Sequence, residues 1–185
     1  MMRIISLLFL VLFSLSAFSQ SKKDIKKYKL KSTTVTVTDA SSSKTQKELY
    51  EKYDGNGNVI EEEEYSKEGV LKKKSSKKYN KNNDVVEEIS YDEKTLAIKK
   101  KTVTEYADEN PVTELVYDAH GKLLEKTIFS YNSLGEKIQE LTYDDKGKTI
   151  KKSLFTYDKN GFKTEKKTYN GNGDLIQTKK YTYTY

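Results

Sequence analysis

Tyrosine recurs at nearly constant intervals over most of this 185-residue chain. Eleven of the tyrosines stand at positions 53, 65, 79, 91, 106, 117, 131, 143, 157, 169 and 183, and the intervals between them alternate around 12 and 14 residues. Together the two intervals make a 26-residue repeat with one irregularity, since Tyr106 comes one position late and the next interval is one residue short. A fixed period constrains the fold strongly, because each repeat packs as one unit against its neighbours.

A short polar sequence follows most of these tyrosines. The segments are DGNG (54–57), SKEG (66–69), DAHG (118–121), NSLG (132–135), DDKG (144–147), DKNG (158–161) and NGNG (170–173). Asp, Asn and Ser bond their own backbone two residues on, and glycine adopts positive φ without steric cost, so each segment predicts a tight turn. Turns at this spacing leave room for strands of roughly 8–10 residues. We therefore predict an all-β fold, a long antiparallel β-meander of roughly 10–12 strands in a twisted or curled sheet.

The alternating interval predicts a difference between the two edges of the sheet. Since successive turns of a meander lie at opposite edges, we expect the turns at the two edges to differ in length or in bulging. Side chains two residues apart share a face, so we expect a tyrosine-rich face that also carries Ile89, Phe129, Leu141 and Phe155. The other face is expected to carry Leu124, Ile128, Ile138, Ile150 and Leu154. The segment YADENPVTELVY (106–117) contains the only proline, Pro111, and lacks the glycine, which predicts a bulged or longer turn.

The first 19 residues have the pattern of a secretory signal peptide. Arg3 precedes an apolar stretch over residues 4–18, and Ala17 and Ser19 are the small residues of a cleavage site. The stretch is shorter than the roughly 20 residues that a bilayer requires, so we expect cleavage and no membrane span in the exported chain. Residues 20–31 are expected to be a polar, irregular segment and residues 32–185 one β-hairpin repeat domain. The domain begins with a strand at STTVTVTD (32–39), and residues 40–47 are expected to be irregular.

The repeated Tyr-Asp-x-x-Gly pattern resembles the YD (RHS-type) repeat of secreted and surface bacterial proteins. The motif is clearest at Tyr53, Tyr117, Tyr143 and Tyr157, each followed by Asp and the turn glycine, and the likeness covers about residues 50–185. The resemblance implies extended β-hairpin sheets and export; large members of that family form shells around toxin segments. This chain lacks the arginine that often follows the glycine and is too short for a shell. MORN-like repeats, also hairpin arrays, match the spacing less well. The AFSQ ending of the leader resembles those of Bacteroidetes-type Gram-negative bacteria, which implies secretion, the periplasm or the cell surface as destination.

Several residue patterns suggest chemistry and fail on closer inspection. The DGNGN (54–58) and NGNGD (170–174) segments resemble calcium loops, but a loop that starts at Asp54 has Tyr65 where a bidentate Glu is required. The only histidine, His120, lies in a turn sequence, and the chain has no cysteine. The EEEE run (61–64) stands near KKK (72–74), which predicts a cross-strand charge ladder and not a catalytic pair. We therefore predict no catalytic, cofactor-binding or metal site and expect no enzyme activity.

The tyrosines are the side chains best suited to bind something. Regularly spaced rings on a sheet can pack on one another across strands and supply the core, or they can be exposed and stack on sugars. In the second case the possible interaction surface comprises Tyr117, Tyr131, Tyr143, Tyr157, Tyr169 and Tyr183. The first hypothesis is an exported, non-enzymatic structural or protein-interaction module at the bacterial cell envelope, with an unknown protein or glycan as partner. The alternative is a carbohydrate- or polyanion-binding protein that uses a tyrosine and lysine stripe. Nucleic acid is not expected, because the net charge of +6 arises from lysines interspersed with glutamates.

Overall fold

The computed structural model describes residues 22–38 and 44–183. It contains one helix and twelve strands. Their bounds are α1 Lys22–Tyr28, β1 Ser32–Thr38, β2 Thr45–Tyr53, β3 Val59–Tyr65, β4 Leu71–Tyr79, β5 Val85–Tyr91, β6 Ile98–Ala107, β7 Asn110–Asp118, β8 Leu123–Tyr131, β9 Lys137–Asp144, β10 Thr149–Tyr157, β11 Lys163–Asn170 and β12 Leu175–Lys180. The predicted signal peptide (1–19), Asp39 and most of the segment that joins β1 to β2 lie outside the described residues.

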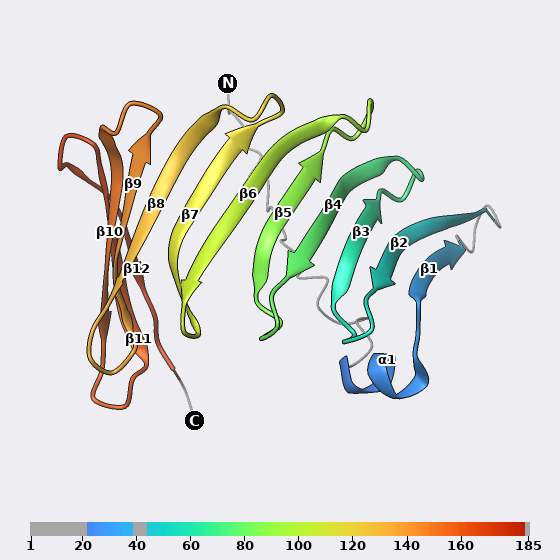
Figure 1. Ribbon diagram of the computed structural model, residues 1–185, viewed down its shortest axis with the longest axis horizontal. Helices are drawn as coiled ribbons and strands as arrows, with labels where there is room; N and C mark the ends of the chain where they lie inside the picture. The colour runs from blue at the N-terminus through green and yellow to red at the C-terminus, as the bar shows by residue number, and fades with distance from the viewer. Residues whose placement is uncertain (1–21, 39–43, 184–185) are drawn as a thin grey trace, which may run out of the picture.

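All twelve strands belong to one sheet, in which spatial order follows chain order from β1 to β12. Every neighbouring pair is antiparallel, for example β3 with β4 and β10 with β11. The sheet twists and curves along its length and stays open, with β1 at one end and β12 at the other (Figure 1). The predicted all-β meander of roughly 10–12 strands is confirmed.

The turns are built as the sequence predicts. In the turn after β2, the Asp54 carboxylate oxygen Oδ1 accepts the backbone N–H groups of Asn56 (2.8 Å) and Asn58 (2.9 Å). The turn after β9 repeats this pattern, with Asp144 accepting from Lys146 and Lys148, both at 2.9 Å. Glycine follows three residues after the acceptor, with φ between +77° and +91° at all seven such turns. An eighth turn, Asn80–Asp84, uses Asn83 at φ +67° in place of glycine, which Asn tolerates.

The alternation of 12 and 14 residues has a different cause from the one predicted. Turns at the two edges are alike: those after β2 and β3 both place a glycine three residues beyond the acceptor, and both are flanked by a register shift at a tyrosine. What differs is strand length, since β3 has seven residues and β4 has nine. The predicted difference between turns is therefore wrong, and the additional residues lie in the even-numbered strands.

The two faces of the sheet differ in burial. Residues directly opposite each other across antiparallel strands share a face, so the register extends one face across the sheet. One face, here called the inner face, carries every strand residue that is buried in the described chain: Glu51, Tyr53, Ser75, Val116, Thr142, Ser153, Phe155 and Thr168. The opposite, outer face carries Leu124 and Ile128, which are 36–40% exposed. Crowding on one side only is what a sheet curved toward that side produces, and it explains why small Ser and Thr side chains line the middle of the inner face.

Two further predictions require correction. Residues 20–31 are not wholly irregular, because α1 forms at Lys22–Tyr28 and buries Ile25 near the turn at Gly57. The chain from residue 45 to 47 is already part of β2. Of the two alternatives predicted near Pro111, the bulge is present as a register shift beside Tyr106. The longer turn is not, since Ala107 pairs with Asn110 and only Asp108 and Glu109 connect the strands. The additional residue of the late Tyr106 lies instead between β5 and β6, where Asp92–Ala97 forms a longer turn.

Candidate functional site

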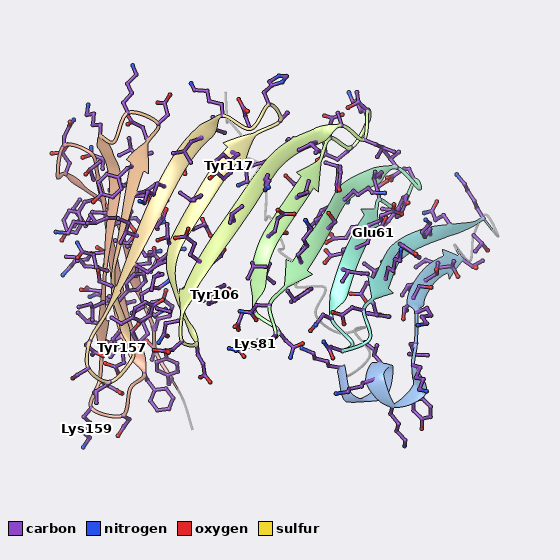
Figure 2. The ribbon with its side chains drawn as sticks, viewed as in Figure 1. Glu61, Lys81, Tyr106, Tyr117, Tyr157 and Lys159 are labelled. Carbon is purple, nitrogen blue, oxygen red and sulfur yellow. The ribbon has the colours of Figure 1, made fainter. Side chains whose placement is uncertain are left out.

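Six tyrosines form a regular row at one edge of the sheet, the lower edge in Figure 1. They stand near the ends of the even-numbered strands, and Tyr106 and Tyr157 are labelled in Figure 2. Each hydroxyl donates a hydrogen bond to the start of the preceding strand. The acceptors are Thr33 Oγ1 for Tyr53 (2.9 Å), and the backbone carbonyl oxygens of Val59 for Tyr79 (2.7 Å), Val85 for Tyr106 (3.1 Å), Pro111 for Tyr131 (2.7 Å), Lys137 for Tyr157 (2.8 Å) and Lys163 for Tyr183 (2.9 Å). Burial raises the pKa of the Tyr79, Tyr131 and Tyr157 hydroxyls. These hydroxyls are therefore structural: they satisfy backbone groups where each hairpin ends.

Five other tyrosines lie at the opposite, upper edge, near the ends of the odd-numbered strands. They are Tyr65, Tyr91, Tyr117, Tyr143 and Tyr169. The Tyr65 hydroxyl donates to Glu63 (2.6 Å), and the Tyr91 hydroxyl shares a hydrogen bond with Ser76 (3.0 Å). Tyr117 and Tyr143 each follow a buried inner-face residue, Val116 and Thr142, so their own rings point to the outer face.

The six tyrosines predicted as one interaction surface thus fall into two sets. Tyr131, Tyr157 and Tyr183 belong to the lower row, whereas Tyr117, Tyr143 and Tyr169 lie at the upper edge on the outer face. The reason is the pairing register. Thr127 pairs with Thr142, an odd-numbered residue with an even-numbered one, and the other regular hairpins do the same. Residues directly opposite each other, which share a face, are therefore an odd number of positions apart. Residues 12 or 14 positions apart on neighbouring strands, such as Tyr131 and Tyr143, consequently lie on opposite faces. The structure does not bring the six together, and Phe129 and Leu141, predicted on one face, also separate.

The predicted charge ladder between β3 and β4 is confirmed. Lys73 pairs with Glu62 and Glu64 on the inner face, and Lys74 pairs with Glu61 (3.2 Å) and Glu63 (2.9 Å) on the outer face. Burial alone would raise the pKa of Glu63, but hydrogen bonds from Lys74, Tyr65 and Lys47 outweigh it and hold the pKa at about 2. This carboxylate stays charged and paired, which suits a structural role.

In the described turns, the polar side chains that could bind a metal ion are used to form the turns themselves. Asp54 uses Oδ1 for two backbone N–H groups and Oδ2 for the Asn58 side-chain amide (2.9 Å), so its oxygens already have protein donors. His120 is exposed in the turn after β7, where its backbone N–H bonds Asp118 (2.8 Å). In the described part of the chain, no three His, Cys, Asp or Glu side chains come close enough to hold a metal ion.

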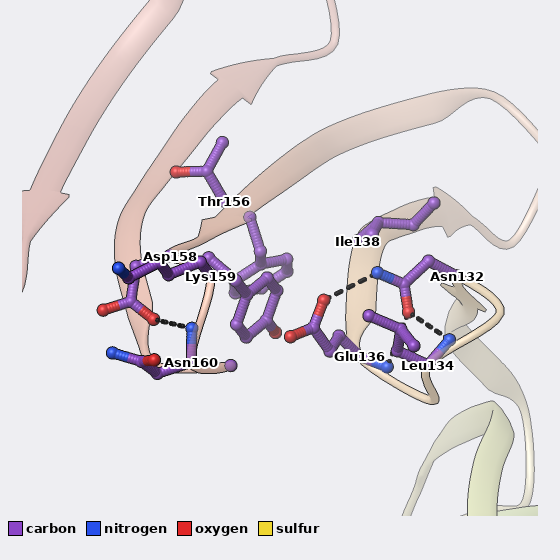
Figure 3. A pocket seen from close by; sticks show the side chains of 11 residues that line it. Asn132, Leu134, Glu136, Ile138, Thr156, Asp158, Lys159 and Asn160 are labelled. Atoms are coloured by element: carbon purple, nitrogen blue, oxygen red, sulfur yellow. Dashed lines mark hydrogen bonds between the residues drawn. The ribbon is translucent and has the colours of Figure 1, made fainter.

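A hollow of about 600 Å³ lies at the lower edge between the turns after β8 and β10 (Figure 3). Phe155, Tyr157, Ile138 and Leu134 provide its apolar lining. The polar groups at its rim are bonded within their own turns. Asn132 donates to Glu136 (2.7 Å) and accepts from the Leu134 backbone, while Asp158 accepts from the Asn160 backbone (2.9 Å). Asn132, Glu136 and Asp158 therefore serve the two turns that flank the hollow.

Beside this hollow lies a second set of residues, of which the sequence predicted only a part. Phe129, Phe155 and Tyr181 occupy the inner face two residues before lower-row tyrosines, and Lys137 and Lys163 lie between them on β9 and β11. The ammonium of Lys137 stands 4.9 Å from the Phe129 ring centroid and 5.2 Å from that of Phe155. That of Lys163 stands 5.0 Å from the Phe155 centroid and 5.6 Å from that of Tyr181. Aromatic and cationic side chains thus alternate across the last strands. The sequence pattern placed Phe129 and Phe155 on a tyrosine-rich face but did not indicate Tyr181 or the two lysines. Comparing residues at 26-residue intervals could have revealed Lys137 and Lys163.

The comparisons with known proteins bear on the fold. No family model and no curated protein matches the chain. Among solved structures, a Tc holotoxin pore from Photorhabdus luminescens matches 76% of this chain at 12% identity with a TM-score of 0.50. A TcdB2-TccC3-TEV structure matches 88% at 13% identity (TM-score 0.41), and a porin-like protein from Bacteroides uniformis matches 73% at 15% identity (TM-score 0.40).

The chain spans 8% of the holotoxin chain, 10% of the TcdB2-TccC3-TEV chain and 49% of the porin-like chain. The holotoxin likeness shows a shared repeat β-sheet fold, in agreement with the predicted resemblance at that level. It does not extend to the YD-repeat family itself, which no sequence match supports. No helix in residues 22–38 or 44–183 has the length and apolar character needed to cross a membrane.

Proposed function

We propose that this chain is an exported, non-enzymatic repeat protein that acts as a structural or protein-interaction module at the bacterial cell envelope. The observation that carries the proposal is the architecture: one open twelve-stranded sheet with two broad faces, held together by turn and edge contacts that repeat along the chain. Asp54, Asp144 and Asp158 accept hydrogen bonds from the backbone of their own turns, so these side chains stabilise the turns. Export rests on the sequence of residues 1–19.

The outer face is where a protein partner would bind. Leu124 and Ile128 are each more than a third exposed there, and Ile128 lies directly opposite Leu141 on β9. Exposed apolar side chains that gather on one face are typical of interaction surfaces. On the inner face, by contrast, small polar and charged residues fill the middle of the sheet.

The test is crosslinking in intact cells that express the full chain, followed by fractionation. We expect the mature chain in the envelope or medium, with a crosslinked partner that is lost on Ile128→Lys. The matched control, Ala119→Lys, adds the same charge in the exposed turn after β7 and should keep the partner. A chain confined to the cytoplasm, or a partner retained equally by both variants, would contradict the proposal.

A further inference from the structure

The residues that lie opposite each other in the middle of the inner face are of the same types in four hairpins and differ in the last one. In four hairpins a glutamate on the odd strand faces a small hydroxyl residue on the even strand: Glu62 with Ser75, Glu88 with Thr102, Glu114 with Thr127, and Glu140 with Ser153. At the same place in the last hairpin, Lys166 on β11 faces Lys179 on β12. The last hairpin therefore has two lysines where the four earlier hairpins have a glutamate opposite a serine or threonine.

This exchange is unfavourable for folding. Like charges directly opposite each other on a sheet repel, because their Cβ atoms are only about 5 Å apart. Glu140 forms an ion pair with Lys166 (3.2 Å) but is shared with Lys137. Burial would raise the pKa of Glu140, and the two lysines more than offset this and lower it, so the carboxylate is charged. Within the described residues, Lys179 has no ion-pair partner. The repulsion at the last hairpin is therefore left largely uncompensated.

Two more lysines extend the basic character across the neighbouring strands. Lys137 on β9 and Lys163 on β11 occupy the position that holds Val59, Val85 and Pro111 in the earlier repeats. Three ammonium groups, those of Lys137, Lys163 and Lys166, each lie within 5.2 Å of the Phe155 ring centroid, and that residue is 6% exposed. Cation–π attraction to this one buried ring holds the three ammonium groups near each other. We call Lys137, Lys163, Lys166 and Lys179 the basic row.

Protection of the sheet edge explains only part of this row. Lysines on an edge strand discourage pairing with another chain, and this accounts for Lys179 and Lys180 on β12. It does not account for Lys137, Lys163 and Lys166, which lie on interior strands whose edges are already paired. Of the four ammonium groups in the basic row, those of Lys137 and Lys166 pair with the Glu140 carboxylate. The row therefore carries more positive than negative charge, which makes it complementary to an anion.

We propose that the basic row binds a linear acidic polysaccharide through its carboxylate or sulfate groups. The row crosses β9 to β12, a distance of about 15 Å at the usual strand spacing, which suits a chain with charges at regular intervals. Single-stranded nucleic acid fits less well, because the Phe155 ring lies under lysines and offers no free face for base stacking. A flat membrane fits less well too, because the inner face is the crowded, curved side of the sheet. The site differs from the tyrosine and lysine stripe predicted from the sequence, and it does not depend on a protein partner at the outer face.

The test replaces the basic pair with the pair that the other hairpins use. Lys166→Glu combined with Lys179→Ser recreates the Glu140 and Ser153 pairing one repeat later, so the variant should fold. The matched control, Lys167→Glu with Lys180→Ser, makes the same charge change on the same strands but on the outer face. Calorimetry and polymer co-sedimentation would use polygalacturonate and dextran sulfate, with neutral dextran, oligo-dT and phosphatidylglycerol vesicles for comparison.

We expect the wild-type chain to bind at least one of the two acidic polysaccharides and not neutral dextran, with affinity that falls as salt rises. The inner-face variant should bind at least about tenfold more weakly, as the loss of a charge-assisted contact predicts, while it still unfolds cooperatively on heating. The outer-face control should bind within about twofold of wild type. Equal loss in both variants, unchanged binding in the inner-face variant, or binding only to vesicles or oligo-dT would overturn the proposal. Loss of the crosslinked protein partner alone would bear on the proposed function and not on this site.

Discussion

The hairpin β3–β4 and the hairpin β11–β12 share a backbone plan and differ in what they place on the inner face. In both hairpins the two strands pair antiparallel, and a register shift occurs beside a tyrosine, Tyr65 in the first and Tyr169 in the last. In the first, Glu62 meets the buried Ser75 and Lys73 neutralises the carboxylate. In the last, Lys166 meets the exposed Lys179. The contrast teaches that turns and tyrosines specify the fold, while the middle positions of the strands are free to carry different chemistry.

The largest expected effect comes from moving the basic pair to the first of these hairpins. Glu62→Lys with Ser75→Lys would place an ammonium where the side chain is 2% exposed, with no carboxylate opposite it. Leaving a charge buried and unpaired costs roughly 3–5 kcal/mol, so we expect a large drop in the denaturant midpoint or failure to fold. The last hairpin tolerates the same pair because β12 is an edge strand with solvent beside Lys179.

The milder variant keeps this prediction testable if the double variant does not fold. Glu62→Gln alone should fold with a smaller loss, measured by urea titration of tyrosine fluorescence. A double variant as stable as wild type would show that curvature does not restrict the inner face at β4, and the comparison of the two hairpins would then fail.

The second prediction compares the effect of adding a Cβ in the turn at Gly57, which lies against α1, with its effect in the turn at Gly147. Gly57 and Gly147 have the same φ within a degree, +78° and +79°, but a Cβ at Gly57 would lie 2.9 Å from the Lys22 carbonyl oxygen, whereas that at Gly147 meets nothing. Gly147→Ala should cost about 1–2 kcal/mol for the left-handed conformation alone. Gly57→Ala should cost roughly 1 kcal/mol more, because α1 must shift. Thermal unfolding of the two variants measures the difference, and equal losses would mean that α1 contributes nothing there.

Acid should weaken the β3–β4 charge ladder. The folded pKa of Glu63, about 2, lies below its ordinary value of 4.5, so its contribution to stability is complete above pH 4.5 and is lost as the pH falls toward 2. We expect Glu63→Gln to reduce stability at pH 7 by roughly 1–3 kcal/mol and by much less near pH 2. Urea unfolding at several pH values tests this, and a loss that does not change with pH would contradict the assigned pKa.

The repeat made the scaffold predictable from the sequence, and the register made the faces unpredictable. Tyrosine spacing and Asx-x-x-Gly segments report local backbone geometry, so the strands, turns and antiparallel order followed from them. Whether Tyr131 and Tyr143 share a face depends on the bulge beside each tyrosine. The position of that bulge cannot be predicted from the type of any single residue. The same holds for Lys166 opposite Lys179: their pairing requires the register of β11 with β12. The sequence pointed to tyrosine as the candidate for binding, whereas the proposed site consists of lysines that are recognised only from the residues opposite them.

The smallest expected effect distinguishes the two rows of tyrosines. The Tyr157 hydroxyl donates to the Lys137 carbonyl oxygen (2.8 Å), so Tyr157→Phe leaves a half-buried carbonyl without its donor and should cost about 1 kcal/mol. Lys137 belongs to the basic row, so this variant should also weaken acidic polysaccharide binding slightly if the tyrosine helps to position β9. Tyr143→Phe, at the upper edge on the outer face, should change stability by less than about 0.5 kcal/mol and leave polysaccharide binding unchanged. Thermal unfolding and calorimetry of the two variants together make the test. If Tyr143→Phe were the more damaging, the upper tyrosines would be the structural row, and the lower row would become the candidate for binding.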